Sequence, residues 1–308
     1  MVSVLLPLYK PDERYLAEQL ESIDAQDYDD FELLVYNDCP DDPSWEDFCR
    51  QHVVSHRLRY DQGERNRGYV KAFEHLVDMA EGTYLVLCDQ DDRWLPGRMS
   101  RGVELLDEGY LLVSCDRQII DGEGRVTVES WRAAHQDDES VTWHTGDHIT
   151  DKAAFTCYSL GMATMLRADV ARSLKPFPRM TGHDKWIALG SSAQGPCANI
   201  EEPLVQYRQH GSNQTGVLRG INCKQDWHQR RTQRSFELVS EFASRFPDHP
   251  DVERMKAFAQ ARMDGDIRGI WHYRSLAPQV ARFEIALRMT PDWAFRAMLR
   301  LVRARAGR

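Results

Sequence analysis

Three carboxylates stand within four residues, directly after a short hydrophobic run. The run 84–88 is followed by Asp89, Gln90, Asp91 and Asp92. An apolar run of this length predicts a buried strand, and ligands of open α/β sheets bind where strands end. Oxygen ligands suit Mg²⁺ or Mn²⁺, and Mg²⁺ is usually held by one or two carboxylates while substrate phosphates complete its shell. The cluster therefore predicts a divalent metal acting on a phosphorylated substrate; the alternative is a solvated acidic turn before a helix near Trp94.

Composition and charge narrow the class of protein. The chain has 308 residues, of which 42% are hydrophobic, and a formal net charge of −9. This suits one large α/β core or two modest domains, and the acidity argues against general nucleic-acid binding. The seven cysteines lack the spacing of a zinc site, the N-terminus lacks a signal-peptide pattern, and no stretch approaches membrane-spanning length. We therefore expect a cytoplasmic protein, at most peripheral at the inner face of the cell membrane.

The first half of the chain predicts a mostly parallel sheet. Short apolar runs alternate with helical patterns, which is typical of βαβ units. We expect strands at 2–6, 31–36, 58–60 and 84–88, and helices at 15–26, 45–52 and 69–80. Three of these strands end in polar loops, at 7–10, 37–42 and 89–92. Because parallel strands present such loops at one edge of the sheet, a nucleotide bound there would meet all three.

The second half predicts further mixed structure and then a helical tail. We expect a helix at 99–107, a strand at 110–115, a polar hairpin and loop at 121–150, helices at 168–174 and 182–189, and two short strands at 198–200 and 204–207. From about Cys223 the pattern is largely helical. In this tail Arg296, Arg300 and Arg303 form a basic stripe beside a wide apolar face. Such a helix either lies on an anionic membrane surface or docks on its own chain or a partner.

Seven segments in order carry a likeness to a known family. They are 2–9 (VSVLLPLY), 20–28 (LESIDAQDY), 37–38 (ND), 66–68 (NRG), 89–94 (DQDDRW), 182–186 (GHDKW) and 202–213 (EPLVQYRQHGSN). Over about residues 2–216 the chain resembles the inverting, metal-dependent family 2 glycosyltransferases of GT-A fold, and especially their bacterial rhamnosyltransferase-like branch. Leu8, Lys10 and Cys39-Pro40 depart from the family pattern. A single motif is weak, whereas seven in the right order are specific.

The resemblance implies the fold and its division. A GT-A fold is a Rossmann-like α/β fold with a mostly parallel central sheet and helices on both faces, followed here by a mainly helical C-terminal extension. It implies a catalytic domain at 1–220, with a nucleotide-sugar-binding half at 1–118 and an acceptor-binding half at 119–220. Residues 221–308 would form the helical C-terminal region, associated with a membrane or a partner.

The chemistry of sugar transfer and the resemblance together assign candidate residues. An attacking acceptor hydroxyl must lose its proton, and a carboxylate is the expected general base; position and resemblance both point to Asp184. The resemblance implies Asp91, Asp89 and His210 as metal ligands. It implies a nucleotide site of Pro7, Tyr9, Asp38, Asn66, Arg67, Asp89 and Gln90. Acceptor or sugar contacts are expected from Trp186, Arg208 and His183.

Plainer interpretations stand beside these. Asp184 is also what a first helical turn favours, Asp38 suits an ordinary turn, and Trp186 at helical spacing suits a core. His210 would equally suit a hydrogen-bonded loop.

We expect an inverting glycosyltransferase that uses Mg²⁺ or Mn²⁺ and dTDP-rhamnose or a UDP-sugar. Its acceptor would be a glycan or a polyprenyl-linked sugar in bacterial surface polysaccharide synthesis. One alternative is a sugar-nucleotidyltransferase, which would want a glycine-rich basic loop after the first strand. Another is a noncatalytic glycan-binding or scaffold protein, which would be expected to lose Asp89, Asp91 or Asp184.

Overall fold

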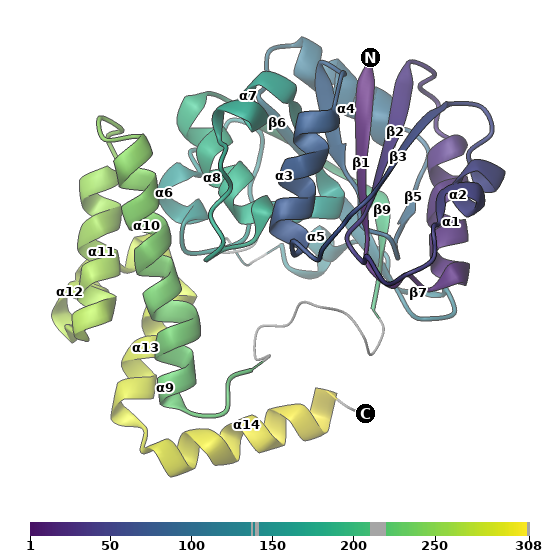
Figure 1. The fold of residues 1–308 in the computed structure, drawn as a ribbon. Coiled ribbons are helices and arrows are strands. Elements are labelled where there is room, and N and C mark those ends of the chain that lie inside the picture. The colour runs from purple at the N-terminus through teal and green to yellow at the C-terminus, as the bar shows by residue number, and fades with distance from the viewer. Residues whose placement is uncertain (137, 139–141, 210–219, 307–308) are drawn as a thin grey trace. The chain divides into compact units, whose positions relative to one another are not determined.

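The computed structural model describes residues 1–136, 138, 142–209 and 220–306 (Figure 1). The chain divides into two compact units. The first comprises Met1–His148 and Tyr158–Gly211, and the second comprises Ile149–Cys157 and Ser212–Arg308. Residues 149–157 thus group with the second unit, whereas the sequence placed them in the acceptor-binding half. The predicted functional division at 118 and 220 stays a prediction.

The first unit is built on a mixed sheet. Within the described residues its strand order is β3-β2-β1-β4-β8-β6-β9-β5, with β7 beside β6. The strands are β1 (Val2–Leu8), β2 (Phe31–Asn37), β3 (Arg57–Gln62), β4 (Tyr84–Leu87), β5 (Arg93–Trp94), β6 (Leu112–Ile120), β7 (Val126–Val128), β8 (Thr164–Arg167) and β9 (Cys197–Arg208). Strands β1 to β4 pair with one another in parallel, and β6 pairs in parallel with β9. Strand β8 is antiparallel to both β4 and β6. The parallel block places the ends of β1, β2 and β4 at one edge, as predicted.

Helices pack on this sheet. In the first unit they are α1 (Glu13–Asp24), α2 (Glu46–His52), α3 (Tyr69–Met79), α4 (Arg98–Asp107), α5 (Trp131–Ala134), α7 (Ala168–Ser173) and α8 (His183–Gln194). Helix α3 buries the apolar stripe that its sequence predicts, including Val70, Phe73 and Leu76, and it lies along the sheet beside β1 (Figure 1). Helix α1 begins two residues before its apolar pattern, because the Asp12 side chain accepts hydrogen bonds from the backbone N–H groups of Arg14 and Tyr15.

The predicted short strands at 198–200 and 204–207 are one strand, β9. Its pairing with β6 slips twice, so that Cys115 faces Ile200, Asp116 faces Pro203 and Arg117 faces Val205. The polar residues 201–202 are therefore accommodated as an irregularity within a strand. Local composition predicted a break there, but pairing along β6 carries the strand through to Arg208.

The second unit is helical. It contains α6 (Thr150–Ala153), α9 (Lys224–Trp227), the π-helical turn η2 (His228–Gln233), α10 (Arg234–Arg245), α11 (Val252–Asp264), α12 (Ile267–His272), the 3₁₀ turn η3 (Arg274–Leu276), α13 (Pro278–Met289) and α14 (Asp292–Ala306). Its centre holds a buried ion pair between Arg262 and Glu284, 2.8 Å apart, and Trp227 and Thr232 also donate to Glu284. Among the helices described, none is both long enough and apolar enough to cross a bilayer.

Candidate functional site

The loops after β1, β2 and β4 are joined by direct hydrogen bonds. The backbone N–H of Asp38 donates to the Leu8 carbonyl at 2.8 Å. The Gln90 side chain accepts from the Tyr9 backbone N–H at 2.9 Å and donates to the Tyr9 carbonyl at 3.2 Å. Gln90 therefore clamps the acidic loop to the end of β1, while the Tyr9 side chain stays 43% exposed. The expectation that these loops share one edge of the sheet is confirmed.

Asp38 organises the loop before α3. One of its carboxylate oxygens accepts from the backbone N–H of Arg67 at 2.7 Å and the other from that of Gly68 at 2.8 Å. Gly68 has φ +78°, a conformation that favours glycine, and is the N-cap residue of α3. Asp38 is buried, whereas Asn66 is exposed at the loop surface. Pro7 lies within β1, opposite Tyr36 of β2.

Three carboxylates from two elements lie close enough for their charges to interact. Asp89 and Asp91 follow β4, and Asp184 lies in the first turn of α8. Burial, together with the charges of Asp91 and Asp184, raises the pKa of Asp89 to about 7. Concentrated negative charge of this kind is relieved by a cation, and oxygen donors suit Mg²⁺ and Mn²⁺. The donor set at Asp89 and Asp91 therefore fits the metal that the sequence predicts.

Asp92 differs from its two neighbours. It is fully buried, and one of its oxygens accepts from the Arg208 backbone N–H at 2.9 Å. Burial and the nearby charges of Asp91 and Asp89 raise its pKa well above the usual range. Its contact with β9 indicates that Asp92 supports the acidic loop.

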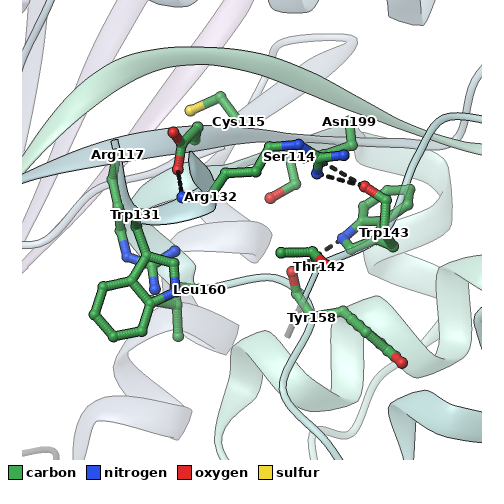
Figure 2. A pocket seen from close by; sticks show the side chains of 11 residues that line it. Ser114, Cys115, Arg117, Trp131, Arg132, Thr142, Trp143, Tyr158, Leu160 and Asn199 are labelled. Atoms are coloured by element: carbon green, nitrogen blue, oxygen red, sulfur yellow. Dashed lines mark hydrogen bonds between the residues drawn. The ribbon is translucent and has the colours of Figure 1, made fainter. Parts of the chain in front are cut away.

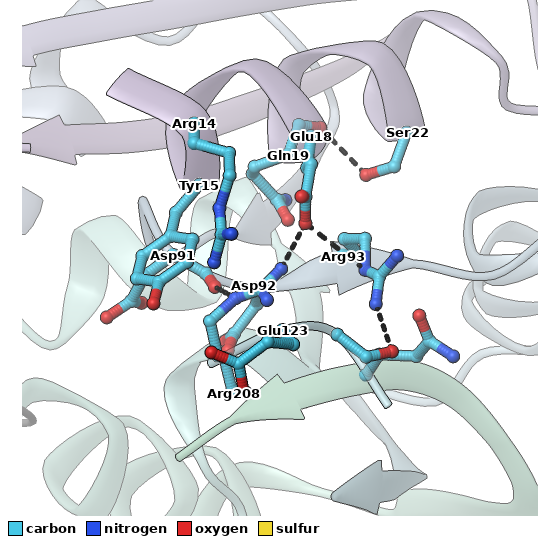
Figure 3. Close-up of polar contacts among 12 residues, drawn as sticks. Arg14, Tyr15, Glu18, Gln19, Ser22, Asp91, Asp92, Arg93, Glu123 and Arg208 are labelled. Atoms are coloured by element: carbon cyan, nitrogen blue, oxygen red, sulfur yellow. Dashed lines mark hydrogen bonds and ion pairs between the residues drawn. The ribbon is translucent and has the colours of Figure 1, made fainter. Parts of the chain in front are cut away.

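Arg208 of β9 fastens the acidic loop to two other segments (Figure 3). Its Nε donates to the Asp91 backbone carbonyl at 2.8 Å, and its guanidinium pairs with Glu18 of α1. It also reaches the carbonyls of residues 121 and 122 in the turn after β6, and lies over the Tyr15 ring at 4.3 Å. The side chain is fully buried. These contacts make Arg208, at the end of β9, a support for the acidic loop. Its predicted contact with the acceptor or sugar stays a prediction.

Replacing Arg208 is expected to destabilise the first unit. Arg208→Gln removes the buried member of a partly buried ion pair and leaves buried acceptors unsatisfied, so we expect a loss of about 3 kcal/mol in the free energy of unfolding. Urea denaturation followed by tryptophan fluorescence measures it. Arg125→Gln, at a side chain that is 74% exposed, should leave the midpoint unchanged. Equal midpoints for Arg208→Gln and wild type would contradict the role of Arg208 as a support.

The start of α8 presents Asp184 and buries its neighbours. The Asp184 side chain is half-buried and accepts from the Lys185 backbone N–H at 2.7 Å. Trp186 is fully buried, and its indole N–H donates to the Leu174 carbonyl at 2.9 Å, which is the packing of a core residue. The predicted contact of Trp186 with the acceptor or sugar stays a prediction. His183 is 5% exposed and stacks on Phe73 with ring centroids 3.8 Å apart. Burial lowers the pKa of His183 to about 4, so its ring is neutral at pH 7 and packs α8 against α3. Its predicted contact with the acceptor or sugar stays a prediction.

A pocket lies between β6, β9 and the segment after α5 (Figure 2). The Trp131 ring lies 4.6 Å from the Arg117 guanidinium, and Asn199 donates to the Trp143 carbonyl at 2.8 Å. The lining residue Leu160 precedes Gly161, which packs closely against His183: a β-carbon added at Gly161 would lie only 2.9 Å from the His183 Nε2. The pocket thus adjoins the start of α8. Sequence analysis missed it, although the two tryptophans within the polar segment 121–150 were a usable signal.

The remaining predicted residue, His210, lies outside the residues that the structure describes.

Comparison with known proteins gives a family match and several relatives. The family model described as glycosyl transferase family 2 matches residues 3–173. EpsE of Bacillus subtilis (strain 168), described as a glycosyltransferase, is 31% identical over 219 residues, covering 68% of this chain and 73% of EpsE. TuaG of the same strain, described as a teichuronic acid biosynthesis glycosyltransferase, is 24% identical over 129 residues, covering 39% of this chain and 51% of TuaG. The uncharacterized protein y4gI of Sinorhizobium fredii is 30% identical over 129 residues, 41% of this chain, and this chain spans only 14% of it.

Solved structures share the fold. TarS of S. aureus, residues 1–349, in complex with UDP-GlcNAc superposes with a TM-score of 0.61 at 16% identity, covering 93% of this chain and 83% of that one. The mannosyltransferase PcManGT of Pyrobaculum calidifontis, in complex with GDP-Man and Mn²⁺, has a TM-score of 0.55 at 19% identity, covering 100% and 80%. The predicted GT-A fold with a helical C-terminal region is confirmed. The family model spans more than half of the sequence, and the chain belongs to glycosyl transferase family 2.

Proposed function

We propose that this chain transfers a sugar from a nucleotide-sugar donor to a glycan acceptor, with inversion at the anomeric carbon. One observation carries the proposal: the end of β4 and the start of α8 bring Asp89, Asp91 and Asp184 within electrostatic reach of one another. Such a transfer needs a pair of ligands that hold a metal ion and a separate carboxylate that acts as the base. Membership of glycosyl transferase family 2 supports it.

Each carboxylate has a separate task in this proposal. Asp89 and Asp91 would hold Mg²⁺ or Mn²⁺, which supplies neutralising charge to the departing diphosphate. Asp184 accepts the proton of the acceptor hydroxyl as that oxygen forms its bond to the anomeric carbon and the bond to the diphosphate breaks. A single direct displacement inverts the anomeric centre. Gln90 and Arg208 keep the acidic loop in place from its two sides.

The nucleotide is proposed to lie across the ends of β1 and β2. Tyr9 offers an exposed ring there. Asp38 contributes chiefly through the 66–68 loop that it organises, because both of its oxygens already accept backbone N–H groups. The choice of dTDP-rhamnose rests on the sequence resemblance alone, whereas the structural neighbours are complexes with UDP-GlcNAc and GDP-Man. TuaG, which is described as a teichuronic acid biosynthesis glycosyltransferase, supports a role in bacterial surface polysaccharide synthesis. The proposed glycan or polyprenyl-linked acceptor rests on the sequence analysis alone.

A donor panel tests the proposal. Thermal stabilisation and hydrolysis are measured with dTDP-rhamnose, UDP-GlcNAc and GDP-mannose, each with Mn²⁺ or with EDTA. We expect one nucleotide to stabilise the protein in a Mn²⁺-dependent way and to be slowly hydrolysed. Absence of any shift would contradict the donor site and favour a noncatalytic glycan-binding or scaffold function.

Trp131 is expected to contribute to acceptor binding. Its ring lines the pocket beside α8, and aromatic and polar groups together suit a sugar ring. Trp131→Ala should raise the acceptor KM with little change in donor KM, measured once the donor panel has identified an active pair. The control is Trp271→Ala, which removes another tryptophan stacked against an arginine, Arg274, at 4.3 Å. Equal effects of the two variants on acceptor KM would contradict this role.

Helix α14 is proposed to touch the membrane. It buries Phe295 and Leu299 in the second unit but leaves Trp293 at 74% and Leu301 at 67% exposure. One face of α14 therefore docks on the chain itself, and the apolar face that stays open supports the proposed contact with a membrane. Arg300, next to Leu301 in the sequence, is also exposed, and exposed tryptophan with basic residues suits an anionic bilayer surface.

Vesicle sedimentation tests this contact. The double variant Trp293→Glu, Leu301→Glu should bind phosphatidylglycerol vesicles more weakly than wild type. Val54→Glu changes an equally exposed apolar side chain of the first unit and should bind as wild type does. Wild type that binds neither these vesicles nor phosphatidylcholine vesicles would overturn the proposal.

A further inference from the structure

A groove lined by cationic side chains runs along the outer face of α3. Its lining includes Arg65, Arg67, Lys71, Glu74 and Asp78, together with Arg179 from the loop before α8. Positions 71, 74 and 78 recur at the spacing of one helical face, so the groove follows α3 for about two turns. Asn66 and Arg67, which the sequence assigned to the nucleotide site, also line the groove, but none of its lining residues belongs to the loops after β1 or β4.

The carboxylates of the groove are already neutralised. Glu74 pairs with Lys71 at 2.8 Å, and Asp78 pairs with Lys175. The groove's histidine, His75, pairs with Asp61 at 2.6 Å. The carboxylates of the groove therefore already have cationic partners and do not neutralise its arginines.

The three arginines of the groove, Arg65, Arg67 and Arg179, form no ion pair with any residue that the structure describes. Among those residues, the only polar contact of the Arg179 side chain is a 3.3 Å hydrogen bond to the Arg67 carbonyl. The Arg67 Nε is buried without a hydrogen-bond partner. A buried N–H group that makes no hydrogen bond destabilises the folded protein, and a ligand that accepts from it would remove this penalty. In a chain whose net charge is −9, an uncompensated basic groove calls for an anionic occupant.

The groove adjoins the proposed base from the α3 side. Tyr69 in the first turn of α3 packs its ring against His183 at a centroid distance of 5.8 Å, and His183 immediately precedes Asp184. A β-carbon at Gly182 would lie 3.9 Å from the Tyr69 hydroxyl. An acceptor whose hydroxyl reaches Asp184 can therefore extend the rest of its chain toward Arg179 and along α3.

We propose that this groove binds a carboxylate or phosphate group on the acceptor, so that the substrate class is an anionic glycan. The inference rests on the proposed function, because it takes Asp184 as the base. Planar guanidinium groups bind both kinds of anion through paired hydrogen bonds, so the groove is expected to accept either.

Calorimetric titration tests the proposal with three defined probes: hexagalacturonate, a glycerol phosphate hexamer and neutral maltohexaose. We expect at least one anionic probe to bind wild type more tightly than maltohexaose and to weaken as salt rises from about 0.05 to about 0.5 M. The double variant Arg65→Gln, Arg179→Gln should weaken it about 10-fold, a loss of about 1.4 kcal/mol. Which anionic probe binds distinguishes a carboxylate from a phosphodiester acceptor.

Two controls separate this proposal from the donor site. Arg57→Gln removes an exposed charge at the amino end of β3, the opposite edge of the sheet, and should bind the probes as wild type does. Nucleotide binding with Mn²⁺ should be unchanged in the double variant. Loss of nucleotide binding in that variant would assign the groove to the donor and overturn the proposal, as would equal binding of charged and neutral probes. Failure of wild type to bind any nucleotide would instead contradict the proposed function, whatever the glycan probes do.

Discussion

Asp184→Asn is expected to slow sugar transfer on the order of 10³-fold, the range of a lost general base. An amide at this position keeps the size of the side chain but cannot take the proton from an acceptor hydroxyl. Donor binding should remain, because the loops at the ends of β1, β2 and β4 are untouched. Single-turnover rates and donor dissociation constants measured on the same preparation separate the two effects.

The matched control is Asp169→Asn. Asp169 also lies in the first turn of a helix, α7, and also accepts from the next backbone N–H, at 2.9 Å. Its replacement should leave the transfer rate unchanged, which separates a general effect of a first-turn carboxylate from a role in proton transfer. A wild-type rate in Asp184→Asn would contradict the assignment of the base.

Asp91→Asn is expected to abolish most metal-dependent activity. A metal ion contributes several kcal/mol to stabilising the leaving diphosphate, and each 1.36 kcal/mol corresponds to tenfold, so we expect roughly a 10³-fold loss in kcat/KM. The affinity for Mn²⁺ in the presence of nucleotide should fall with it, as measured by electron paramagnetic resonance of free Mn²⁺.

Asp47→Asn is the control for charge. Asp47 is an exposed carboxylate in the first turn of α2 and should affect neither Mn²⁺ affinity nor rate. If wild type and Asp91→Asn transfer sugar equally fast in EDTA and in Mn²⁺, the metal site at Asp89 and Asp91 is refuted while the Asp184 base is untouched.

Local sequence pattern predicted the nucleotide-binding half of the fold well. The period of apolar residues placed β1, β2, β4 and α3 within a few residues of their observed bounds. Polar residues at the ends of those strands then predicted one edge with several loops, which the hydrogen bonds between Tyr9 and Gln90 bear out. The roles assigned to Asp184, Asp89 and Asp91 remain proposals for the experiments above.

Local pattern did not show which side chains the fold buries. Trp186 and Arg208 stand in family-like segments, yet both are fully buried. Whether an arginine binds a substrate or a group of its own chain depends on which distant segments surround it. Arg208 pairs with Glu18, which lies 190 positions earlier in the chain. The basic groove was equally invisible, because Arg65 and Arg179 come together only through the packing of α3 beside the loop before α8.

Sequence alone thus established the family, the order of the first elements and the residue types able to hold a metal and accept a proton. These follow from short-range periodicity and from motifs whose members are neighbours in the chain. Folding settled which of those side chains are exposed, which act as supports, and which charges stay uncompensated. The reason is that burial and pairing arise from contacts between residues far apart in sequence. No local pattern encodes the ion pair of Arg208 with Glu18, or the lack of an ion pair for Arg179 among the described residues.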